Sequence, residues 1–454
     1  MLENRICNYQ KMHSLFSLIF CFIILLCSVI KGYFVAYPLL LSLVILLMTF
    51  AFQGFPVRDL IAMAFASSQK AFPIILILLL IAAVTAVWMA AGTIPALVSY
   101  GTQLINPQYF IFSAFVLTSF ISVLLGTSFG TVSTVGVALM IMVKGEDVNP
   151  HIVAGAIIAG AYFGDRCSPM SSSANLVASI TKTKLHKNII AMISTAWLPL
   201  MASSLIYLIL SISNPVQVRN SGLISEIPNF FNINPLVLLP AFAVIALCLF
   251  KVEVKLTLLV SIGIGFVLGI FFQDYSFVKL INFVVFGFNL EPRTDLSEVV
   301  TGGGIFSMLQ VSIVVILSTS LSGLIVGTRT LAAVENIINK VSSRSRLFLG
   351  TTIVGLASAA FGCTQTLAIL MTHQLVKEKY EQEQLDNYQL ATDIENTAVV
   401  LSPLIPWNIA GLVPATILMT DSGFIPYAVY LYLIPLLNWV QFKVLESKTQ
   451  GEFE

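Results

Sequence analysis

Long apolar stretches separated by short polar segments make up most of this chain. Eight of them are close to the length that a helix needs to cross a hydrocarbon core of about 30 Å. With 57% hydrophobic and 10% charged residues, the 454 residues cannot cover a soluble core with polar side chains. The pattern predicts an all-α polytopic membrane protein with crossings at residues 14–30, 33–53, 71–99, 188–212, 235–250, 254–272, 304–327 and 424–442.

Four further stretches depart from simple crossings. Residues 109–143 and 347–376 carry small polar clusters at their middles, and residues 151–181 and 388–420 contain Ser-Pro pairs. At about 1.5 Å per residue, a 35-residue helix would be roughly 50 Å long, too long for one crossing. We therefore expect 109–143 and 347–376 to be re-entrant hairpins, and 151–181 and 388–420 to be broken helices.

The lysines and arginines support this topology. Cytoplasmic loops carry an excess of both residue types. With two hairpins and the N-terminus inside, 17 basic residues lie on the cytoplasmic side and 5 outside, with Arg166 left in the membrane. If both stretches crossed fully, the split would be 12 against 10. We expect ten crossings plus two hairpins in the cell membrane, with both termini cytoplasmic.

The same order of segments occurs twice. Residues 1–212 and 235–442 each contain a hairpin and five expected crossings, one of which is the broken helix, and 443–454 form a cytoplasmic tail. Because five is odd, the second half must be inserted upside down relative to the first. This arrangement is the inverted repeat of secondary transporters, whose substrate sites lie at broken helices near mid-membrane.

The Ser-Pro pairs, Ser168-Pro169 and Ser402-Pro403, predict where the two helices unwind. Proline lacks the backbone donor and clashes with the preceding turn. The freed backbone groups persist in a membrane only where protein, water or ions satisfy them. A packing kink is the alternative for a lone proline, but two matched breaks rich in hydroxyls favour a binding site.

Two acidic residues approach these breaks. Asp165 and Glu395 lie three and seven residues before the serines, and carboxylates inside a membrane are usually functional. We expect Asp165 to bind a cation or a proton and Glu395 to assist. Arg166 has three candidate roles: neutralising one of these acids, orienting one, or binding an anionic substrate. Asp393 is interpreted as a solvated charge at the membrane edge.

Oxygen and amide groups complete the candidate site. Hard cations such as Na⁺ favour oxygen donors, and Asp165 with Thr127 and Ser128 is the Na⁺ candidate; helix capping is the alternative role for the hairpin-tip hydroxyls. The other candidate residues are Ser168, Ser172, Asn175, Thr364, Gln365, Asn396, Ser402 and Asn408.

Other classes of protein are disfavoured. The net charge of +1 comes without a basic, aromatic-rich stripe, so no nucleic-acid partner is expected. The chain has no HExxH motif, which argues against a metal-dependent membrane enzyme, and its six cysteines contain no CxxC pair. We expect no cofactor beyond transported Na⁺ and H⁺. The expected partners are the lipid bilayer and a small ion or solute, and a homodimer is one option for assembly.

Five motifs in this order resemble the NhaC-type sodium/proton antiporter family over about residues 33–442. They are LGTSFGT (125–131), GAYFGDRCSP (160–169), TGGGIFSM (301–308), FGCTQT (361–366) and SPLIPWN (402–408). The resemblance implies antiport of Na⁺, or in some branches of small organic anions or amino acids. Two positions depart from the family pattern, since Ser172 and Asn396 stand where the family usually has acids.

The function expected from these observations is Na⁺/H⁺ antiport by alternating access around a mid-membrane cation site. The alternative is an antiporter or symporter of the same fold for an organic solute, such as malate, lactate or an amino acid, with Arg166 holding its carboxylate.

Overall fold

The computed structural model describes residues 2–69, 71–104, 106–143, 148–216, 227–250, 252–290, 301–328, 330 and 343–451. Apart from one isolated bridge between Phe288 and Gly302, the regular structure of these residues is helical. By length and composition, five helices in the described part are apolar enough to cross a membrane, or six if one pair bent by 52° counts as a single span. The prediction of an all-α polytopic membrane protein is confirmed.

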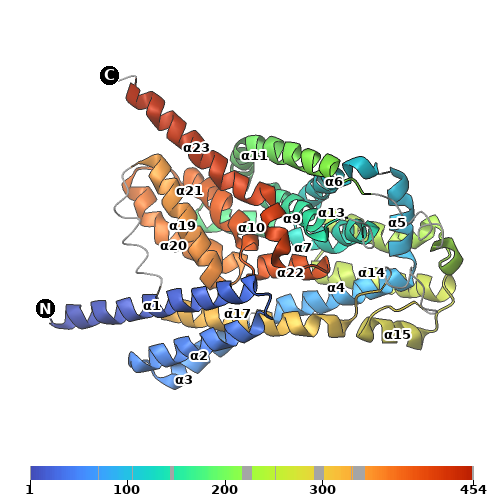
Figure 1. Ribbon diagram of the computed structural model, residues 1–454, viewed down its shortest axis with the longest axis horizontal. Coiled ribbons are helices and arrows are strands. Elements are labelled where there is room, and N and C mark those ends of the chain that lie inside the picture. Colours follow the sequence, from blue (N-terminus) through green and yellow to red (C-terminus); the bar gives the residue numbers. More distant parts are fainter. Residues whose placement is uncertain are drawn as a thin grey trace.

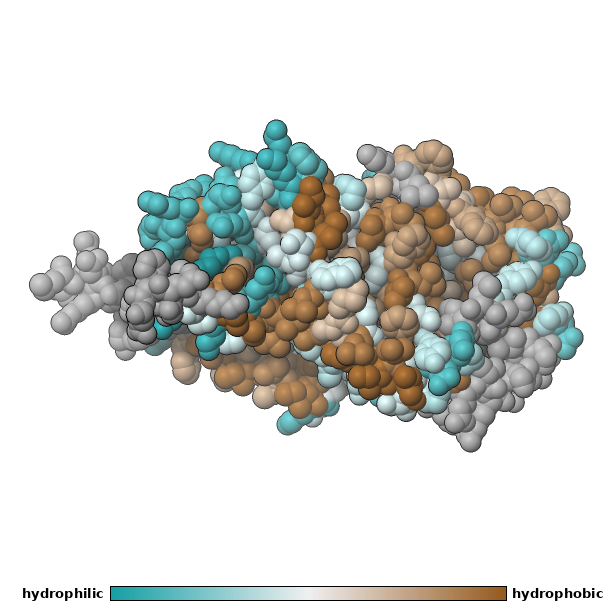
Figure 2. All heavy atoms as spheres, turned by 90° about the horizontal axis from the view of Figure 1, so that it is seen from above, coloured by the Kyte–Doolittle hydropathy of each residue, from teal (hydrophilic) through white to brown (hydrophobic). Residues whose placement is uncertain are grey.

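The surface agrees with a membrane environment. Large apolar side chains are exposed along helices that would face lipid, including Phe52 (92% exposed) and Phe242 (61%). Figure 2 shows hydrophobic residues over much of the middle of one face, with hydrophilic patches toward its two ends. A soluble protein rarely leaves so large an apolar surface uncovered.

The chain begins with α1 (Leu2–Ile30), α2 (Ala36–Phe52) and α3 (Val57–Gln69). Helix α4 (Phe72–Ala90) follows α3, and its first residue agrees with the span expected to start at residue 71. The span expected at 71–99 ends later than this helix. It stops at Gly92, whose φ of 76° is left-handed, and α5 (Thr93–Leu104) turns away from α4 (Figure 1).

A helical hairpin and a broken helix follow. Helix α6 (Phe110–Leu125) leads into α7 (Ser128–Thr131), the π-helical turn η2 (Val132–Gly136) and α8 (Val137–Met142). Helix α9 (Pro150–Cys167) is then separated from α10 (Ser172–Ile180) by four residues, and α11 (Leu185–Ser213) ends this half.

The second half repeats this order. After η3 (Pro235–Leu238), α13 (Leu239–Leu249), α14 (Val254–Phe271) and α15 (Phe277–Phe286), the turn η4 (Ile305–Met308) leads into α17 (Leu309–Gly327). A second hairpin consists of α19 (Arg344–Gly362) and α20 (Gln365–Gln382), which pack side by side. The second broken helix comprises α21 (Asn387–Ile394), the π-helical turn η5 (Glu395–Val399), η6 (Ser402–Leu404) and α22 (Ile409–Ile417). The turn η7 (Ser422–Tyr427) and α23 (Val429–Gly451) follow.

The hairpin tips and broken helices lie near the centre of the molecule. In Figure 1, α7, α9, α10 and α22 meet there, and the ends of α1 and α23 that carry the two termini lie at the same end of the long axis. Helices α2 and α3 pack on α17, and α14 and α15 pack on α4. These outer helices flank the region in which the polar breaks come together.

Candidate functional site

The first break is a four-residue segment at Ser168–Ser171. Pro169 cannot donate a backbone hydrogen bond, so the chain leaves the helix there. Ser168 Oγ donates to Val123 O at 2.7 Å, which ties the break to the first hairpin. Asn175 Nδ2 donates to Pro169 O and Ser171 O, so it satisfies carbonyls that the break leaves free.

Asp165 lies one turn before this break and is 4% exposed. Ser171 Oγ donates to its Oδ1 at 3.4 Å, and Gln365 Nε2 donates to its Oδ2 at 3.3 Å. Ser173 Oγ donates to its main-chain carbonyl at 3.2 Å. Because Gln365 belongs to α20, one buried carboxylate connects the first broken helix with the second hairpin.

The tip of the first hairpin also reaches Asp165. Gly126 ends α6 with a left-handed φ of 67°, and a Cβ there would lie 2.5 Å from Met170 Cβ and 2.9 Å from Ser171 N. Only glycine allows this approach. Ser128, the first residue of α7, is buried, and its backbone contacts the Asp165 carboxyl group. Both tips and the first break therefore converge on Asp165.

The threonines at the two tips cap helices. Thr127 Oγ1 accepts from Gly130 N at 3.4 Å, and Thr364 Oγ1 accepts from Leu367 N at 3.2 Å. These are N-cap bonds of α7 and α20, the alternative that the sequence left open. The second tip turns at Cys363, whose φ of 55° is also left-handed.

The second hairpin is fastened to the second break by several hydrogen bonds. Cys363 O accepts from Ile409 N at 2.9 Å, and Trp407 Nε1 donates to Ala360 O at 2.7 Å. Asn408 Nδ2 donates to Ala359 O at 2.7 Å, while its Oδ1 caps α22. The polar atoms of Asn408 therefore hold the hairpin and cap a helix.

The helix before the second break continues further than its counterpart. It passes through the π-helical turn η5 and the short turn η6, and leaves helical geometry at Ile405. Ser402 Oγ donates to Ala398 O at 2.6 Å within this helix. A π-helical turn inside a helix is uncommon and often marks a functional site.

The turn η5 carries Glu395 and Asn396, which are fully buried. Neither carboxylate oxygen of Glu395 has a hydrogen-bond partner among the described residues. Asn396 Oδ1 accepts from the guanidinium of Arg166 and from Thr195 Oγ1. Arg166 is also fully buried and donates to Thr195 Oγ1 at 2.8 Å.

Arg166 therefore has an amide, a hydroxyl and the sulfur of Cys167 as partners. Within the described ranges it forms no ion pair. Its position beside Asn396 nevertheless places its charge close to Glu395.

Two predicted site residues lie elsewhere. Ser172 and Asn175 are exposed, and the contacts with Asp165 come instead from Ser171 and Ser173. Ser171 is the N-cap of α10, since its Oγ accepts from Ala174 N. A serine at the cap position directly after the proline break is a local signal for this register.

Asp393 corrects another expectation. It was interpreted as a solvated charge, but it is 1% exposed and forms an ion pair of 2.7 Å with Arg344. The expectation failed because α19 and α20 cover this turn of α21, and the distance along the sequence between Arg344 and Asp393 hides their contact. Thr195 and Tyr380 were likewise missed as members of polar clusters.

The arrangement can bind a small cation. Asp165 supplies a carboxylate, and the hydroxyl groups of Ser171 and Ser173 lie beside it, 2.8 Å apart. Hard cations are bound by such oxygen ligands. The buried Glu395 and Arg166 lie next to this cluster and set its electrostatic surroundings.

These features define a polytopic helical membrane transporter with a buried carboxylate at its centre. Residues 6–212 and 160–439 match the model of the Na⁺/H⁺ antiporter family, so the chain belongs to that family. This confirms the resemblance found in the sequence motifs.

Three relatives match the chain over most of its length. The Na⁺/H⁺ antiporter NhaC of Bacillus subtilis is 27% identical over 92% of this chain and 95% of its own. The malate-2H⁺/Na⁺-lactate antiporter of the same species is 27% identical, over 82% of this chain and 81% of its own. An uncharacterized Na⁺/H⁺ antiporter of Haemophilus influenzae is 28% identical, over 79% and 80%.

Proposed function

We propose that this protein exchanges Na⁺ for H⁺ across the cell membrane, with Asp165 as the centre of the transported cation's site. The observation that carries the proposal is the convergence of Ser171 from the first break and Gln365 from the second hairpin on one buried carboxylate. A group that bridges both halves is well placed to couple ion binding to their relative motion. The family membership and the NhaC relative support Na⁺ and H⁺ as the exchanged ions.

The proposed mechanism is alternating access by two halves of opposite insertion. Helix α3 packs on α17 and α15 packs on α4, which is the pattern expected when equivalent helices exchange places across a two-fold axis. In this proposal, both termini face the cytoplasm and the two hairpins enter the membrane from opposite sides. Na⁺ and H⁺ compete for Asp165, and Glu395 assists.

The second candidate is exchange of an organic carboxylate. It is favoured by Arg166, a buried guanidinium that lacks an ion pair within the described residues, and by the malate/lactate antiporter among the relatives. A substrate carboxylate could form the bidentate contact that arginine favours.

Transport by purified protein in proteoliposomes tests both candidates. Gradients of Na⁺, Li⁺ and K⁺ are imposed in turn. If the first proposal is correct, the Na⁺ gradient should change the internal pH. Counterflow of labelled malate, lactate and amino acids tests the second. Counterflow without a Na⁺-driven pH change would overturn Na⁺/H⁺ exchange in favour of the organic substrate.

A further inference from the structure

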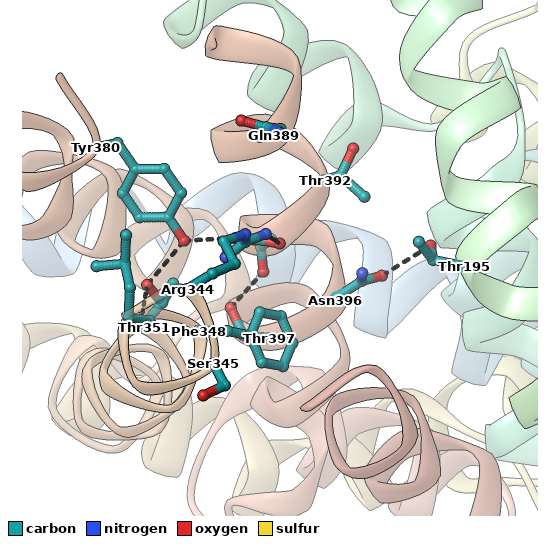
Figure 3. Close-up of polar contacts among 12 residues, drawn as sticks. Thr195, Arg344, Ser345, Phe348, Thr351, Tyr380, Gln389, Thr392, Asn396 and Thr397 are labelled. Carbon is teal, nitrogen blue, oxygen red and sulfur yellow. Dashed lines mark hydrogen bonds and ion pairs between the residues drawn. The ribbon is translucent and has the colours of Figure 1, made fainter. Parts of the chain in front are cut away.

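A buried polar cluster lies on one side of the turn that carries Glu395. Arg344 at the start of α19 pairs with Asp393 of α21 at 2.7 Å, and Tyr380 Oη of α20 donates to the same carboxylate at 2.6 Å. Thr351 Oγ1 lies 3.0 Å from Tyr380 Oη. Figure 3 shows Arg344, Tyr380 and Thr351 gathered beside the helical coil that bears Asn396 and Thr397.

The cluster stabilises the charge of the Asp393 carboxylate and fixes its orientation. The Asp393 side chain is 2% exposed and that of Arg344 is 21% exposed, so the pair lies mostly out of water. The Arg344 guanidinium also lies 4.1 Å from the centre of the Phe442 ring in α23. Burying a carboxylate is costly unless it is paired and hydrogen-bonded, so Arg344 and Tyr380 together make this placement of Asp393 tenable.

Asp393 in turn lies at the entry to η5. Its main-chain carbonyl accepts from Thr397 Oγ1 at 2.6 Å, and Glu395 begins the π-helical turn two residues later. On the other side of the coil, Asn396 faces Thr195 (Figure 3). The Oδ1 atom of Asn396 also accepts from the guanidinium of Arg166. The turn is thus held on one side by the Arg344 cluster and on the other by the Arg166 cluster.

We propose that Arg344 is a positioning residue for transport: by holding Asp393, it fixes the π-helical turn that presents Glu395 and Asn396 to the transport site. The proposal rests on the proposed function for the role of that site. Arg344 itself touches neither Asp165 nor Glu395 and acts through the backbone of η5.

Four variants test the charge pair, with Arg346→Gln as the matched control. Arg346 lies on the same helix and carries the same charge, but it is exposed. We expect Arg344→Gln to raise the apparent KM for Na⁺ about tenfold, with a smaller change in maximal rate per folded protein, because the site is displaced and not removed. Arg344→Lys should recover most of the affinity, since it keeps the charge.

The double variant R344Q/D393N separates the loss of positioning from the effect of a buried, unpaired charge on Asp393. Arg344→Gln alone leaves Asp393 buried without its cation, whereas R344Q/D393N leaves no orphaned charge. We expect R344Q/D393N and D393N to raise the KM for Na⁺ as R344Q does, because each variant loses the contact that fixes the turn. A wild-type KM in the double variant would show that the unpaired charge alone disturbs R344Q, and would overturn the positioning role. If all four variants lose folded protein but keep the wild-type KM, the positioning role is overturned.

A second measurement does not depend on the transported ion. Amide hydrogen exchange should be faster at residues 393–400 in Arg344→Gln than in the wild type, and unchanged at 172–180 in α10. Unchanged exchange at 393–400 would overturn the proposal. If the wild type drives no Na⁺-dependent pH change, the function proposed above fails, while the exchange result still decides whether Arg344 fixes this turn.

Discussion

The two hairpins are packed against their broken helices by different means. In the first half, Gly160 and Gly164 of α9 face α6, and a Cβ at Gly164 would overlap the main chain of Ser122 and Val123. In the second half, the closest equivalent is looser, since a Cβ at Gly355 would lie 3.1 Å from Ala398 N.

The first half adds close backbone contact to hydrogen bonds such as that from Ser168 Oγ to Val123 O, whereas the second half relies on polar bonds. Asn408 and Trp407 bind the carbonyls of α19 near the tip, and the Arg344–Asp393 pair joins the hairpin to α21 at the other end. Small residues permit helices in membranes to approach closely, whereas polar pairs join helices at a greater distance. The same order of elements is thus stabilised by different contacts in the two halves, so the contacts in one half do not predict those in the other.

The largest effect should come from filling the glycine contact of the first half. Gly164→Ala places a methyl group against the main chain of α6, and neither helix can move without disturbing the break. We expect a loss of about 2–3 kcal/mol of stability, seen as a lower unfolding temperature of the purified protein in detergent. The matched control is Gly263→Ala on α14, where nothing lies within 4 Å. Equal unfolding temperatures of the two variants would contradict close backbone packing in the first half.

Asn408→Ala should have the next largest effect, because it acts on the polar fastening of the second half. It removes the cap of α22 and the side-chain donor to Ala359 O, which keeps only its bond from Cys363 N, for an expected cost of about 2 kcal/mol. Asn149→Ala is the control, since Asn149 only caps α9 through His151 N at an exposed position. A larger loss of thermal stability in the control would contradict the fastening role of Asn408.

Gln365→Ala tests the bond that joins the halves at Asp165. Gln365 Nε2 donates to Asp165 Oδ2 and also to Val399 O, each at 3.3 Å. Loss of this side chain therefore removes the hydrogen bond between Asp165 and the second hairpin. We expect a rise of about fivefold in the apparent KM for Na⁺, roughly 1 kcal/mol. Gln374→Ala, an exposed change on the same helix, serves as the control. An unchanged KM in the Gln365 variant would mean that the bond is incidental.

The smallest effect concerns the end of α23, where Glu446 accepts from Ser345 N at 2.7 Å and from Ser345 Oγ at 2.5 Å. Slight burial favours the neutral acid, but these hydrogen bonds outweigh it and hold the pKa of Glu446 below its ordinary value. The bonds therefore stabilise the fold at neutral pH, and this contribution is lost as the pH falls through the lowered pKa.

Glu446→Gln should accordingly lower the unfolding temperature slightly at pH 7, and the difference from the wild type should shrink on acidification toward pH 4. A difference that grows as the pH falls would contradict the assigned bonds.

Much of the fold follows from the sequence, because apolar length and proline act locally. The breaks at Ser168-Pro169 and before Asn408 depend on residues adjacent to them.

The site was harder to predict in detail. Asp165 stood out as a carboxylate in an apolar segment, but the choice of Ser171 and Ser173 over Ser172 depends on helical register after the break. The Arg344–Asp393 pair joins residues 49 positions apart, and only tertiary packing brings them together. Such contacts carry no local signal.

Sodium-driven exchange by Asp165→Asn in proteoliposomes tests the central claim most directly. The amide keeps the size of the side chain and removes its charge. Asp59→Asn, an exposed change on α3, is the control. We predict that the Asp165 variant inserts and folds but produces no Na⁺-dependent pH change. The control should exchange as the wild type does. Exchange at the wild-type rate by folded Asp165→Asn protein would contradict the account.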